Sequence, residues 1–420
     1  MALSKKPVTG MKDILPEEME IRDYVIRIIK DTYRQFGFTG IETPCMENLE
    51  NLSNKQGGEN EKLIFKVMKR GDKLNIDTAQ SENDLADMAM RYDLTVPLVR
   101  FYSNNNTVLQ SPFKALQIGP VWRADRPQRG RYRQFYQCDI DILGDATNLA
   151  ETELITATTT CLGKLGFKKF EIRINDRRIL KTMADYAGFA ADNYDDIFII
   201  LDKMDKIGID GVEEELIKFG LDEAGVKKYL DLFKGVEVHK DDCLDYIASS
   251  LGEFLDTNVK EWLDEIISNV NANKAADFEI VFDPTLVRGM SYYTGTIFEI
   301  AMPELGIACG GGGRYDKMIG KFTGQDTPAC GFSIGFERIV LLLLENGFKI
   351  PDSGKKIAFL IEKNMPKDRM NMIMRDAAEL RQSGNIVLVS TMNKNKKFQK
   401  EQLEKAGYTE YKEYYREALK

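Results

Sequence analysis

The sequence predicts an α+β fold in which a largely antiparallel sheet is flanked by helices, with a helical insertion and a small, shortened α/β domain at the C-terminus. Three observations predict this fold class. Two strand-like runs, 113–121 and 135–143, enclose a polar segment and predict a hairpin. Further strands return after a long helical stretch, with helices set around them. Residues 351–420, in contrast, alternate between strands and helices.

The first helix is predicted over residues 13–36, because Pro16 suits the first turn of a helix and acidic residues follow it. Residues 39–44 are predicted to form a strand. A strand-like stretch comes next, and Thr95 with Pro97 then suits the start of a helix. The pattern continues with a helix at 150–165 and a strand at 170–174.

Residues 178–273 are dense in Leu, Asp, Lys and Glu at helical spacing and predict a helical insertion. The elements expected after it are strands at 279–282, 295–301 and 329–334, a helix at 335–344, and then strand 357–361, helix 367–383, strand 386–390 and helix 396–406. Gly347 and Pro351 mark a boundary. The predicted domains are a core in two parts, 1–177 and 274–347, the insertion at 178–273 and the C-terminal domain at 351–420.

Length and composition indicate an ordinary globular protein. A chain of 420 residues is too long for one core and suggests two or three domains. Its residues are 43% hydrophobic and 30% charged, which is typical of such proteins. No apolar run approaches the roughly 20 residues that a membrane span requires, and the first residues lack the apolar core of a signal peptide. We therefore expect a cytoplasmic protein with no membrane association.

Cysteine and histidine usage excludes several kinds of chemistry. The six cysteines are scattered without a CxxC pair, so neither a zinc site nor a disulfide framework is indicated. His239 is the one histidine, and it lies in a polar stretch far from every arginine-rich or glycine-rich element. A Ser/His triad, a histidine metal site and histidine general-base chemistry are therefore excluded. Arginines, carboxylates and tyrosines remain as candidate functional groups.

The net charge of −8 is unevenly distributed. Residues 351–420 hold 15 Lys and Arg against 10 Asp and Glu, whereas the first 350 residues hold 43 against 56. A basic tail on an acidic body is typical of a protein with a nucleic-acid partner. Chance variation of charge along the chain is the alternative interpretation.

Five arginines lie within residues 123–137, between the two strands of the predicted hairpin. Guanidinium groups bind phosphate bidentately and keep their charge, so this pattern favours a polyanionic ligand over a solvated surface hairpin. Arg131, Arg133 and Phe135 lie at alternate positions and would share one face of an extended chain. Phosphates and a stacked base would fit that face.

Two glycine-bearing segments are further candidates. CGGGGRYD, residues 309–316, is neither a dinucleotide-binding fingerprint nor a P-loop. It either lets a ligand approach the backbone closely or forms a simple loop. GFSIGFER, residues 331–338, reads as a strand that runs through a glycine into a helix. Arg338 in the first turn opposes the helix dipole, and an anionic ligand at the helix start would account for it.

Four segments together, RADRPQRGRYRQFYQ, LVRGMSYYTGTIFE, GGGRYD and PACGFSIGFER, resemble the histidyl-tRNA synthetase family in order and spacing. The arginine hairpin is similar to class II synthetase motif 2, residues 331–338 to motif 3, and the segment around Pro44 to motif 1. Residues 288–293 and 311–316 resemble two signatures of the histidyl enzymes. The resemblance covers Pro7 to Leu344 and continues, weakened, into the tail.

The resemblance implies ATP-dependent activation of histidine to histidyl-adenylate and its transfer to the 3' end of tRNA(His). Arg123 and Arg288 would be catalytic, on the two sides of the α-phosphate. Phe135 and Arg338 would enclose the adenine, and Arg131 would hold the γ-phosphate. Magnesium is expected on the ATP phosphates, with ligands that the sequence does not identify.

The amino acid would be held by a second set of residues. By resemblance, the α-ammonium meets acceptors at Asp93, Thr95 and Gln137, and the imidazole lies between Asp141 and Tyr293 with Tyr292 beside them. The full implied histidine-binding set is Asp93, Leu94, Thr95, Arg123, Gln137, Asp141, Arg288, Tyr292 and Tyr293. A site that bonds both ring nitrogens rejects other side chains, so no editing domain is expected.

The family also implies partners. Gln128 and Arg129 of the motif 2 loop would contact the tRNA acceptor end, and the helical insertion would clamp the acceptor arm, with structural padding as the alternative. Pairing through motif 1 would give a homodimer. Two departures from the family pattern stand out. Ser291 replaces an acidic residue, and the last residues, GYTEYKEYYREALK, do not supply the closing strands expected of an anticodon-binding domain.

An alternative is the regulatory subunit of ATP phosphoribosyltransferase, an inactive relative that binds histidine and lacks the anticodon domain. The retained arginines of motif 2, Phe135, Arg338 and the basic tail argue against it, because a histidine sensor requires none of them. A repurposed RNA-binding protein without enzymatic activity is a third possibility, and the retained ATP-site residues argue against it too.

Overall fold

The computed structural model describes residues 3–53, 61–236, 238–287, 292–303, 306–351 and 354–417. The chain divides into two compact units. One comprises Met1–Ile14 with Arg22–Asn346, and the other comprises Leu15–Ile21 with Gly347–Lys420. Within the described ranges, no helix has the length and apolar character needed to cross a membrane.

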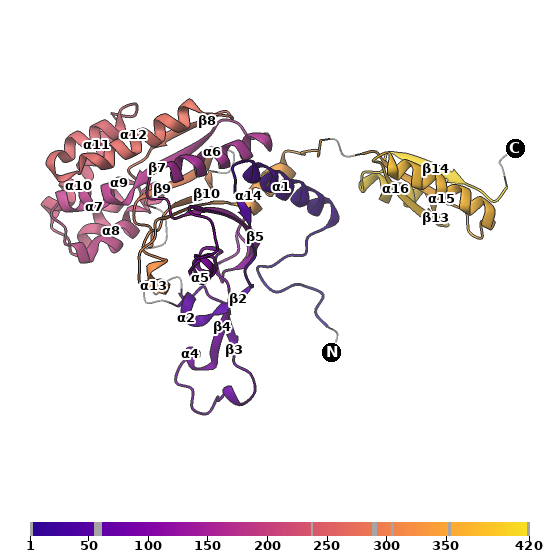
Figure 1. Ribbon diagram of the computed structural model, residues 1–420, viewed down its shortest axis with the longest axis horizontal. Helices are drawn as coiled ribbons and strands as arrows, with labels where there is room; N and C mark the ends of the chain where they lie inside the picture. Colours follow the sequence, from indigo (N-terminus) through magenta and orange to yellow (C-terminus); the bar gives the residue numbers. More distant parts are fainter. Residues whose placement is uncertain are drawn as a thin grey trace. The chain divides into compact units, whose positions relative to one another are not determined.

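An eight-stranded sheet forms the centre of the first unit (Figure 1). Its strands, in spatial order, are β1 (Thr39–Gly40), β5 (Phe113–Trp122), β6 (Gln134–Leu143), β11 (Ala329–Ile334), β10 (Ile307–Arg314), β9 (Thr296–Met302), β7 (Phe170–Asp176) and β8 (Phe278–Phe282). Only the outermost pairs, β1 with β5 and β7 with β8, are parallel. The prediction of a largely antiparallel sheet is therefore confirmed.

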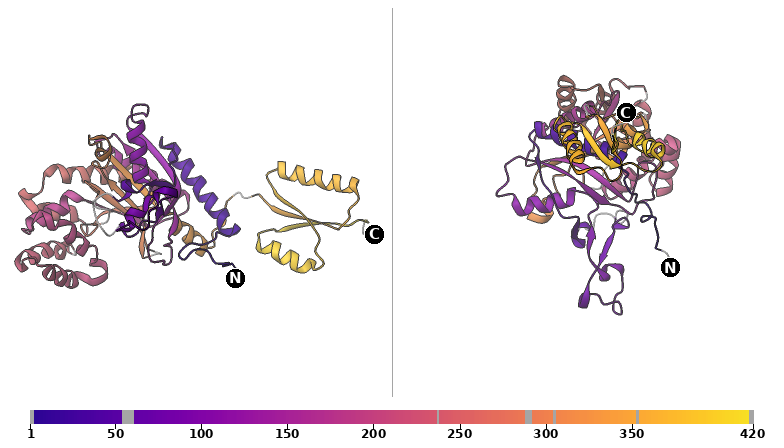
Figure 2. Two further views of the ribbon diagram at one scale, coloured as in Figure 1. Left: turned by 90° about the horizontal axis from the view of Figure 1, so that it is seen from below. Right: turned by 90° about the vertical axis from the view of Figure 1, so that its right-hand side faces the viewer.

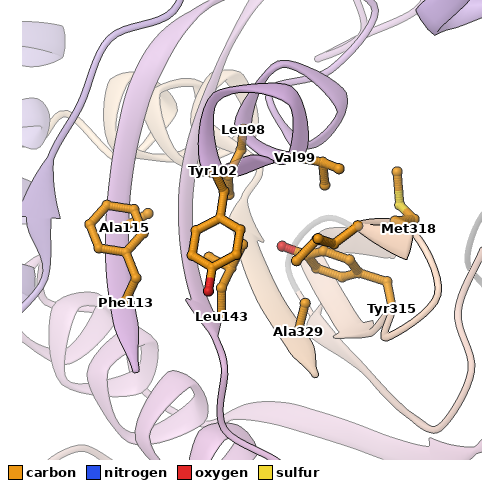
Figure 3. Close-up of a cluster of buried hydrophobic side chains, with 10 residues drawn as sticks. Leu98, Val99, Tyr102, Phe113, Ala115, Leu143, Tyr315, Met318 and Ala329 are labelled. Carbon is orange, nitrogen blue, oxygen red and sulfur yellow. The ribbon is translucent and has the colours of Figure 1, made fainter. Parts of the chain in front are cut away.

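Helices cover both faces of this sheet (Figure 1). One face carries α1 (Pro16–Gln35), α6 (Leu149–Lys164) and α14 (Phe336–Glu345), and the other carries α5 (Thr95–Asn105). Figure 3 shows the apolar side chains under α5, where Leu98 and Tyr102 pack on Phe113, Leu143 and other buried residues. This cluster holds α5 against the sheet, and with it the residues just before α5, which include Asp93.

The region between α1 and α5 differs from its prediction. The strand predicted at 39–44 ends at Gly40, because the Thr43 carbonyl accepts a bond from the Arg91 side chain at 2.7 Å instead of joining a ladder. A small separate sheet follows, with α2 (Leu49–Leu52), the 3-10 turn η1 (Gly71–Lys73), α4 (Glu82–Leu85) and the strands β2 (Met46–Asn48), β4 (Ala86–Met90) and β3 (Lys66–Met68). The sequence indicated only a strand-like stretch there.

The helical stretch lies between β7 and β8 and gathers at one end of the sheet (Figure 1). It contains α7 (Arg177–Tyr186), η2 (Ala191–Asn193), α8 (Tyr194–Leu201), α9 (Met204–Phe219), α10 (Glu223–Val236), α11 (Cys243–Leu251), η3 (Gly252–Phe254) and α12 (Thr257–Ala272). Trp262 of α12 ties it to the sheet, since the guanidinium groups of Arg178 and Arg314 lie 5.6 and 5.4 Å from its ring centre. The indole N–H of Trp262 also donates to the Thr296 hydroxyl at 3.1 Å.

The second unit holds a parallel three-stranded sheet in the order β13-β12-β14. Its elements are β12 (Lys356–Ile361), α15 (Lys367–Gln382), β13 (Ile386–Thr391), α16 (Lys396–Lys405) and β14 (Glu410–Tyr414). The two helices cover opposite faces (Figure 2). The expectation that the last residues supply no closing strand is wrong. Strand β14 pairs with β12 although its sequence is polar. Its Tyr414 packs on Phe359 of β12, and its Glu413 forms an ion pair with Lys400 of α16.

Candidate active site

Two adjoining cavities lie over β6, β10 and β11. We call them the larger cavity, of about 280 Å³, and the smaller cavity, of about 190 Å³. They share the lining residues Arg123, Gln137, Tyr293, Gly311, Gly312 and Ser333. Because the walls are shared, ligands in the two cavities would meet beside Arg123 and Gln137. Such an arrangement suits a reaction between two bound molecules.

The larger cavity gathers the residues that the resemblance assigns to ATP. Arg123, Arg131, Phe135 and Arg338 all line it. Arg131 is half-exposed and lies 4.0 Å from a carboxylate oxygen of Asp125. Arg338 lies in the first turn of α14 and donates to the carbonyl of Ala308. The cavity thus combines an aromatic ring with several cations, as a nucleotide requires.

Arg123 is held by aromatic rings rather than by an acid. Its guanidinium lies 4.3 Å from the ring centre of Tyr92 and 5.1 Å from that of Phe135. Its Nε–H donates to the Tyr92 carbonyl at 3.1 Å. Across the described ranges, its side chain forms no ion pair with a carboxylate. The charge is therefore fixed in place while remaining available to an anionic ligand.

Arg133 does not join this group, so the prediction that Arg131, Arg133 and Phe135 share a face is wrong for Arg133. Its side chain donates to the carbonyls of Asp125 at 3.2 Å and Thr9 at 3.4 Å. The reason is that β6 begins only at Gln134, so the alternation of an extended strand does not reach back to residue 133. Arg133 instead anchors the N-terminal segment to the base of the hairpin.

The smaller cavity gathers most of the residues that the resemblance assigns to histidine. Asp93, Thr95, Gln137, Asp141, Tyr292 and Tyr293 line it, together with Arg123. Leu94 is buried instead, and its carbonyl accepts from the Gln117 side chain at 3.1 Å. Arg288 lies outside the described residues, as does Ser291.

The carboxylates of this cavity are buried and anchored. Asp141 accepts from the Tyr315 hydroxyl at 2.6 Å, and burial raises the pKa of its carboxyl to about 7. Asp93 accepts from the backbone N–H of Val96 at 3.0 Å, and burial raises its pKa as well. Tyr292 and Tyr293 cross edge to face with ring centres 4.8 Å apart. A cationic or proton-donating ligand would restore the charge that these acids lose on burial.

The glycine run at 310–313 forms part of strand β10, and its first three glycines line the cavities, so it is not a simple loop. A Cβ at Gly312 would lie 1.9 Å from the Gly331 carbonyl oxygen, and one at Gly311 would lie 2.8 Å from the Phe298 carbonyl oxygen. A Cβ at Gly331 would lie 2.0 Å from the Asp141 carboxylate. The glycines therefore let neighbouring strands and the buried acid approach closely.

Several lining residues were not predicted from the sequence. Tyr92, Tyr315 and Ser333 belong to segments that were recognised, but they carried no separate signal. Asp139 could have been found, because Gln137, Asp139 and Asp141 alternate along one strand and so share a face. The two residues assigned to tRNA, Gln128 and Arg129, are exposed at the hairpin tip, where Arg129 pairs with Glu345.

Comparison with known proteins agrees with this geometry. The sequence model of the family described as Histidyl-tRNA synthetase matches residues 10–339. A histidine–tRNA ligase from Leifsonia xyli subsp. xyli is 42% identical over 421 residues, covering 98% of this chain and 95% of the relative. The crystal structure of a histidyl-tRNA synthetase from Nostoc sp. PCC 7120 aligns with a TM-score of 0.78 at 27% identity, covering 97% of this chain and 90% of that one.

A second solved structure bears on the alternative. It is described as an ATP phosphoribosyltransferase regulatory subunit/histidyl-tRNA synthetase from Bacillus halodurans C. It aligns with a TM-score of 0.77 but at 19% identity, covering 99% of this chain and 98% of that one. This likeness shows a common fold alone.

Proposed function

The chain belongs to the histidyl-tRNA synthetase family, and on this premise we propose how its two cavities divide the work. The reaction is the ATP-dependent activation of histidine to histidyl-adenylate, followed by transfer to the 3' end of tRNA(His). We assign ATP to the larger cavity and histidine to the smaller one. This assignment rests on the wall that the two cavities share, which includes Arg123 and Gln137. Substrates bound on the two sides of this wall would lie next to each other.

The chemical step requires position and charge neutralisation rather than a general base. A carboxylate oxygen of histidine attacks the α-phosphorus of ATP, a new oxygen–phosphorus bond forms, and pyrophosphate leaves with the electrons of the broken bond. Arg123, at the junction, would hold the attacking carboxylate and the α-phosphate together. We assign Arg288 to the opposite side of the α-phosphate, by resemblance.

For the nucleotide, we propose that Phe135 stacks on the adenine and that Arg338 lies against its other face. The cation of Arg131 would take the γ-phosphate. Support comes from the three side chains lining one cavity. Flat rings enclosed by an aromatic ring and a guanidinium gain from stacking and from cation–π attraction.

Replacing Arg338 by methionine, which keeps an unbranched chain, is expected to raise the KM for ATP roughly tenfold, because it removes a desolvated cation–π contact of about 1–2 kcal/mol. The KM for histidine is the internal control and is expected to stay unchanged. Pyrophosphate exchange measured at varied ATP tests this. An unaltered KM for ATP would remove Arg338 from the adenine site.

For the amino acid, we propose that Asp93, Thr95 and Gln137 receive the α-ammonium and that Asp141 receives the imidazole, with Tyr292 and Tyr293 beside it. Asp141 is already oriented by the Tyr315 hydroxyl, so its position does not depend on the ligand. A buried acid that is fixed in this way favours a ligand with an N–H at one particular place.

The Asp141→Asn variant is expected to raise the KM for histidine about 10- to 100-fold, the range for losing a hydrogen bond to a charged group. The KM for ATP is expected to change by less than about threefold, because Asp141 lines only the smaller cavity. Exchange kinetics at varied histidine would measure both. Normal histidine kinetics in this variant would exclude the imidazole contact.

Magnesium fits the larger cavity only as an ion carried by the nucleotide. Among the residues that the structure describes, no group of three or more His, Cys, Asp or Glu side chains could hold a metal. Of the carboxylates lining the cavity, Glu337 pairs with Arg22 at 2.6 Å. We propose that Asp125 and Glu299, which also line it, would face the ion. One or two carboxylates plus phosphate oxygens is the usual Mg²⁺ environment, where the ion neutralises phosphate charge.

Contacts with tRNA are proposed for Gln128 and Arg129 at the hairpin tip. The helical segment 178–273 carries 22 acidic and 10 basic side chains, a net charge of −12, and it therefore does not attract a phosphate backbone at long range. We accordingly assign the first electrostatic contact to the arginine hairpin rather than to this segment. A homodimer, formed through the motif 1 region, and a cytoplasmic location are proposed from family membership.

Two parallel assays test the proposal as a whole. Histidine-dependent exchange of pyrophosphate into ATP reports on the two cavities, and charging of tRNA(His) by the same chain reports on the complete reaction. We expect activity in both assays. Histidine binding without exchange would favour the regulatory relative, an outcome against which the 42% identity to a ligase argues.

A further inference from the structure

We propose that Asp139 is a direct binding residue for the α-ammonium group of histidine. This inference rests on the proposed assignment of histidine to the smaller cavity and extends it to a residue outside the set implied by resemblance. Asp139 lines the smaller cavity and does not line the larger one. Its place between Gln137 and Asp141 on β6 puts all three side chains on one face of the strand.

Two buried acceptors in this cavity have no donor among the residues that the structure describes. The Oδ1 atom of Asp139 and the Oε1 atom of Gln137 are inaccessible to water and make no hydrogen bond within the described structure. Asp139 is only 4% exposed, and its other oxygen accepts from the Gln137 side chain at 3.3 Å. A buried polar atom without a partner is costly, so this pair calls for a ligand that supplies donors. An ammonium group has three N–H donors and a full positive charge.

The order of residues along β6 identifies which part of histidine lies there. Gln137 lines both cavities, next to Arg123, where the carboxylate must lie to attack ATP. Asp141 lies further along the strand, held by Tyr315, in the place proposed for the imidazole. Same-face residues on a strand are about 7 Å apart. The α-carbon and its ammonium, which lie between the two ends of histidine, would therefore pass alongside Asp139.

The charges around Asp139 favour a cation. Asp93, from the segment before α5, and Asp141 add negative charge, and Arg123 is the cation among the described residues lining this cavity. Burial, and then the charge of Asp141, raise the pKa of the Asp139 carboxyl well above its usual range, against a smaller lowering by Ser333. An arriving ammonium would reverse this effect by stabilising the ionised carboxylate.

Three ligands separate the ammonium contact from a structural role. The probes are histidine, histidinol, which keeps the amino group without the carboxylate, and imidazolepropionate, which is histidine without its amino group. In the Asp139→Asn variant, titration calorimetry is expected to show histidine and histidinol bound about 10- to 100-fold more weakly. Imidazolepropionate is expected to bind within about threefold of its affinity for the wild type, because it has no ammonium to lose.

Asp141→Asn is the matched control on the same strand, and it is expected to weaken all three ligands because all three carry the imidazole. Equal weakening of all three ligands by Asp139→Asn would overturn the proposal and leave Asp139 a structural role. Asp139→Ser provides a second variant if the first unfolds, and thermal unfolding checks both. Failure of the wild-type chain to bind histidine would instead overturn the proposed function itself, so the two failures are distinguishable.

Discussion

Replacing Arg123 by alanine is expected to lower the rate of histidine-dependent pyrophosphate exchange by about 10²- to 10³-fold, the scale for removing one preorganised charge contact to the transition state. The reason is its position. Arg123 lines both cavities and contacts the rings of Tyr92 and Phe135, and it forms no ion pair with a carboxylate in the described part of the chain. Its charge is therefore placed before the substrates arrive, and no other described arginine lines both cavities.

Arg126→Ala is the matched control for this experiment. Arg126 lies three residues further along the same segment, is exposed, and lines neither cavity. Its loss is expected to leave the exchange rate within about twofold, because exchange is measured without tRNA and the side chain does not face the substrates. If Arg123→Ala retained more than about a tenth of the wild-type rate while folding normally, its assignment to the α-phosphate would be wrong.

The Glu151→Ala variant is expected to lose about 3–5 kcal/mol of unfolding free energy, because it leaves a buried guanidinium without its partner. Glu151 of α6 is fully buried and holds Arg314 of β10 through two bonds of 2.8 and 2.7 Å. Arg314 also donates to the carbonyls of Asp145 and Thr147, in the loop after β6. The pair therefore joins a helix, a central strand and the end of the strand that carries the buried acids.

Glu153→Ala is the control on the same helix. Glu153 forms a partly exposed ion pair with Lys114 at 2.6 Å, and such pairs contribute about 0.2–1 kcal/mol. Urea unfolding followed by tryptophan fluorescence measures both variants, and Trp262 beside Arg314 places a reporter at the site. Equal losses of unfolding free energy in the two variants would mean that the buried Glu151–Arg314 pair stabilises the fold no more than the partly exposed Glu153–Lys114 pair.

The parts of the fold that could be predicted from the sequence are those in which apolar residues recur at the spacing of a helix or strand. Strand β11 matches its prediction because a short apolar run is a strong signal, and helix α15 matches closely because its apolar residues recur at helical spacing. Strand β10 has glycine where a strand normally shows its apolar residues, and β14 has the polar sequence EYKEY, in which Glu413 pairs with Lys400. Neither strand could be recognised from local periodicity.

The candidate site was predictable in its residue types and less so in its geometry. The family resemblance assigned Arg123, Phe135 and Arg338 to one ligand, and the structure places all three around one cavity. The different role of Arg133 depends on a hydrogen bond to Thr9, 124 residues away in the chain, which local spacing does not reveal. Alternation along β6 does place Asp139 on the same face as Gln137 and Asp141, but the sequence does not show that its Oδ1 lacks a donor among the described residues.

The glycines at 310–313 of β10, most of which line the two cavities, restrict which mutations the gene can carry. At positions 310–313, an added Cβ would lie between 1.9 and 2.8 Å from a backbone carbonyl oxygen of a neighbouring strand. Such contacts require the backbone to move, and every missense change in a glycine codon adds at least one carbon atom. These four consecutive codons therefore form a stretch in which no amino-acid replacement is conservative. We expect a saturation mutagenesis library selected for growth to retain only synonymous changes there.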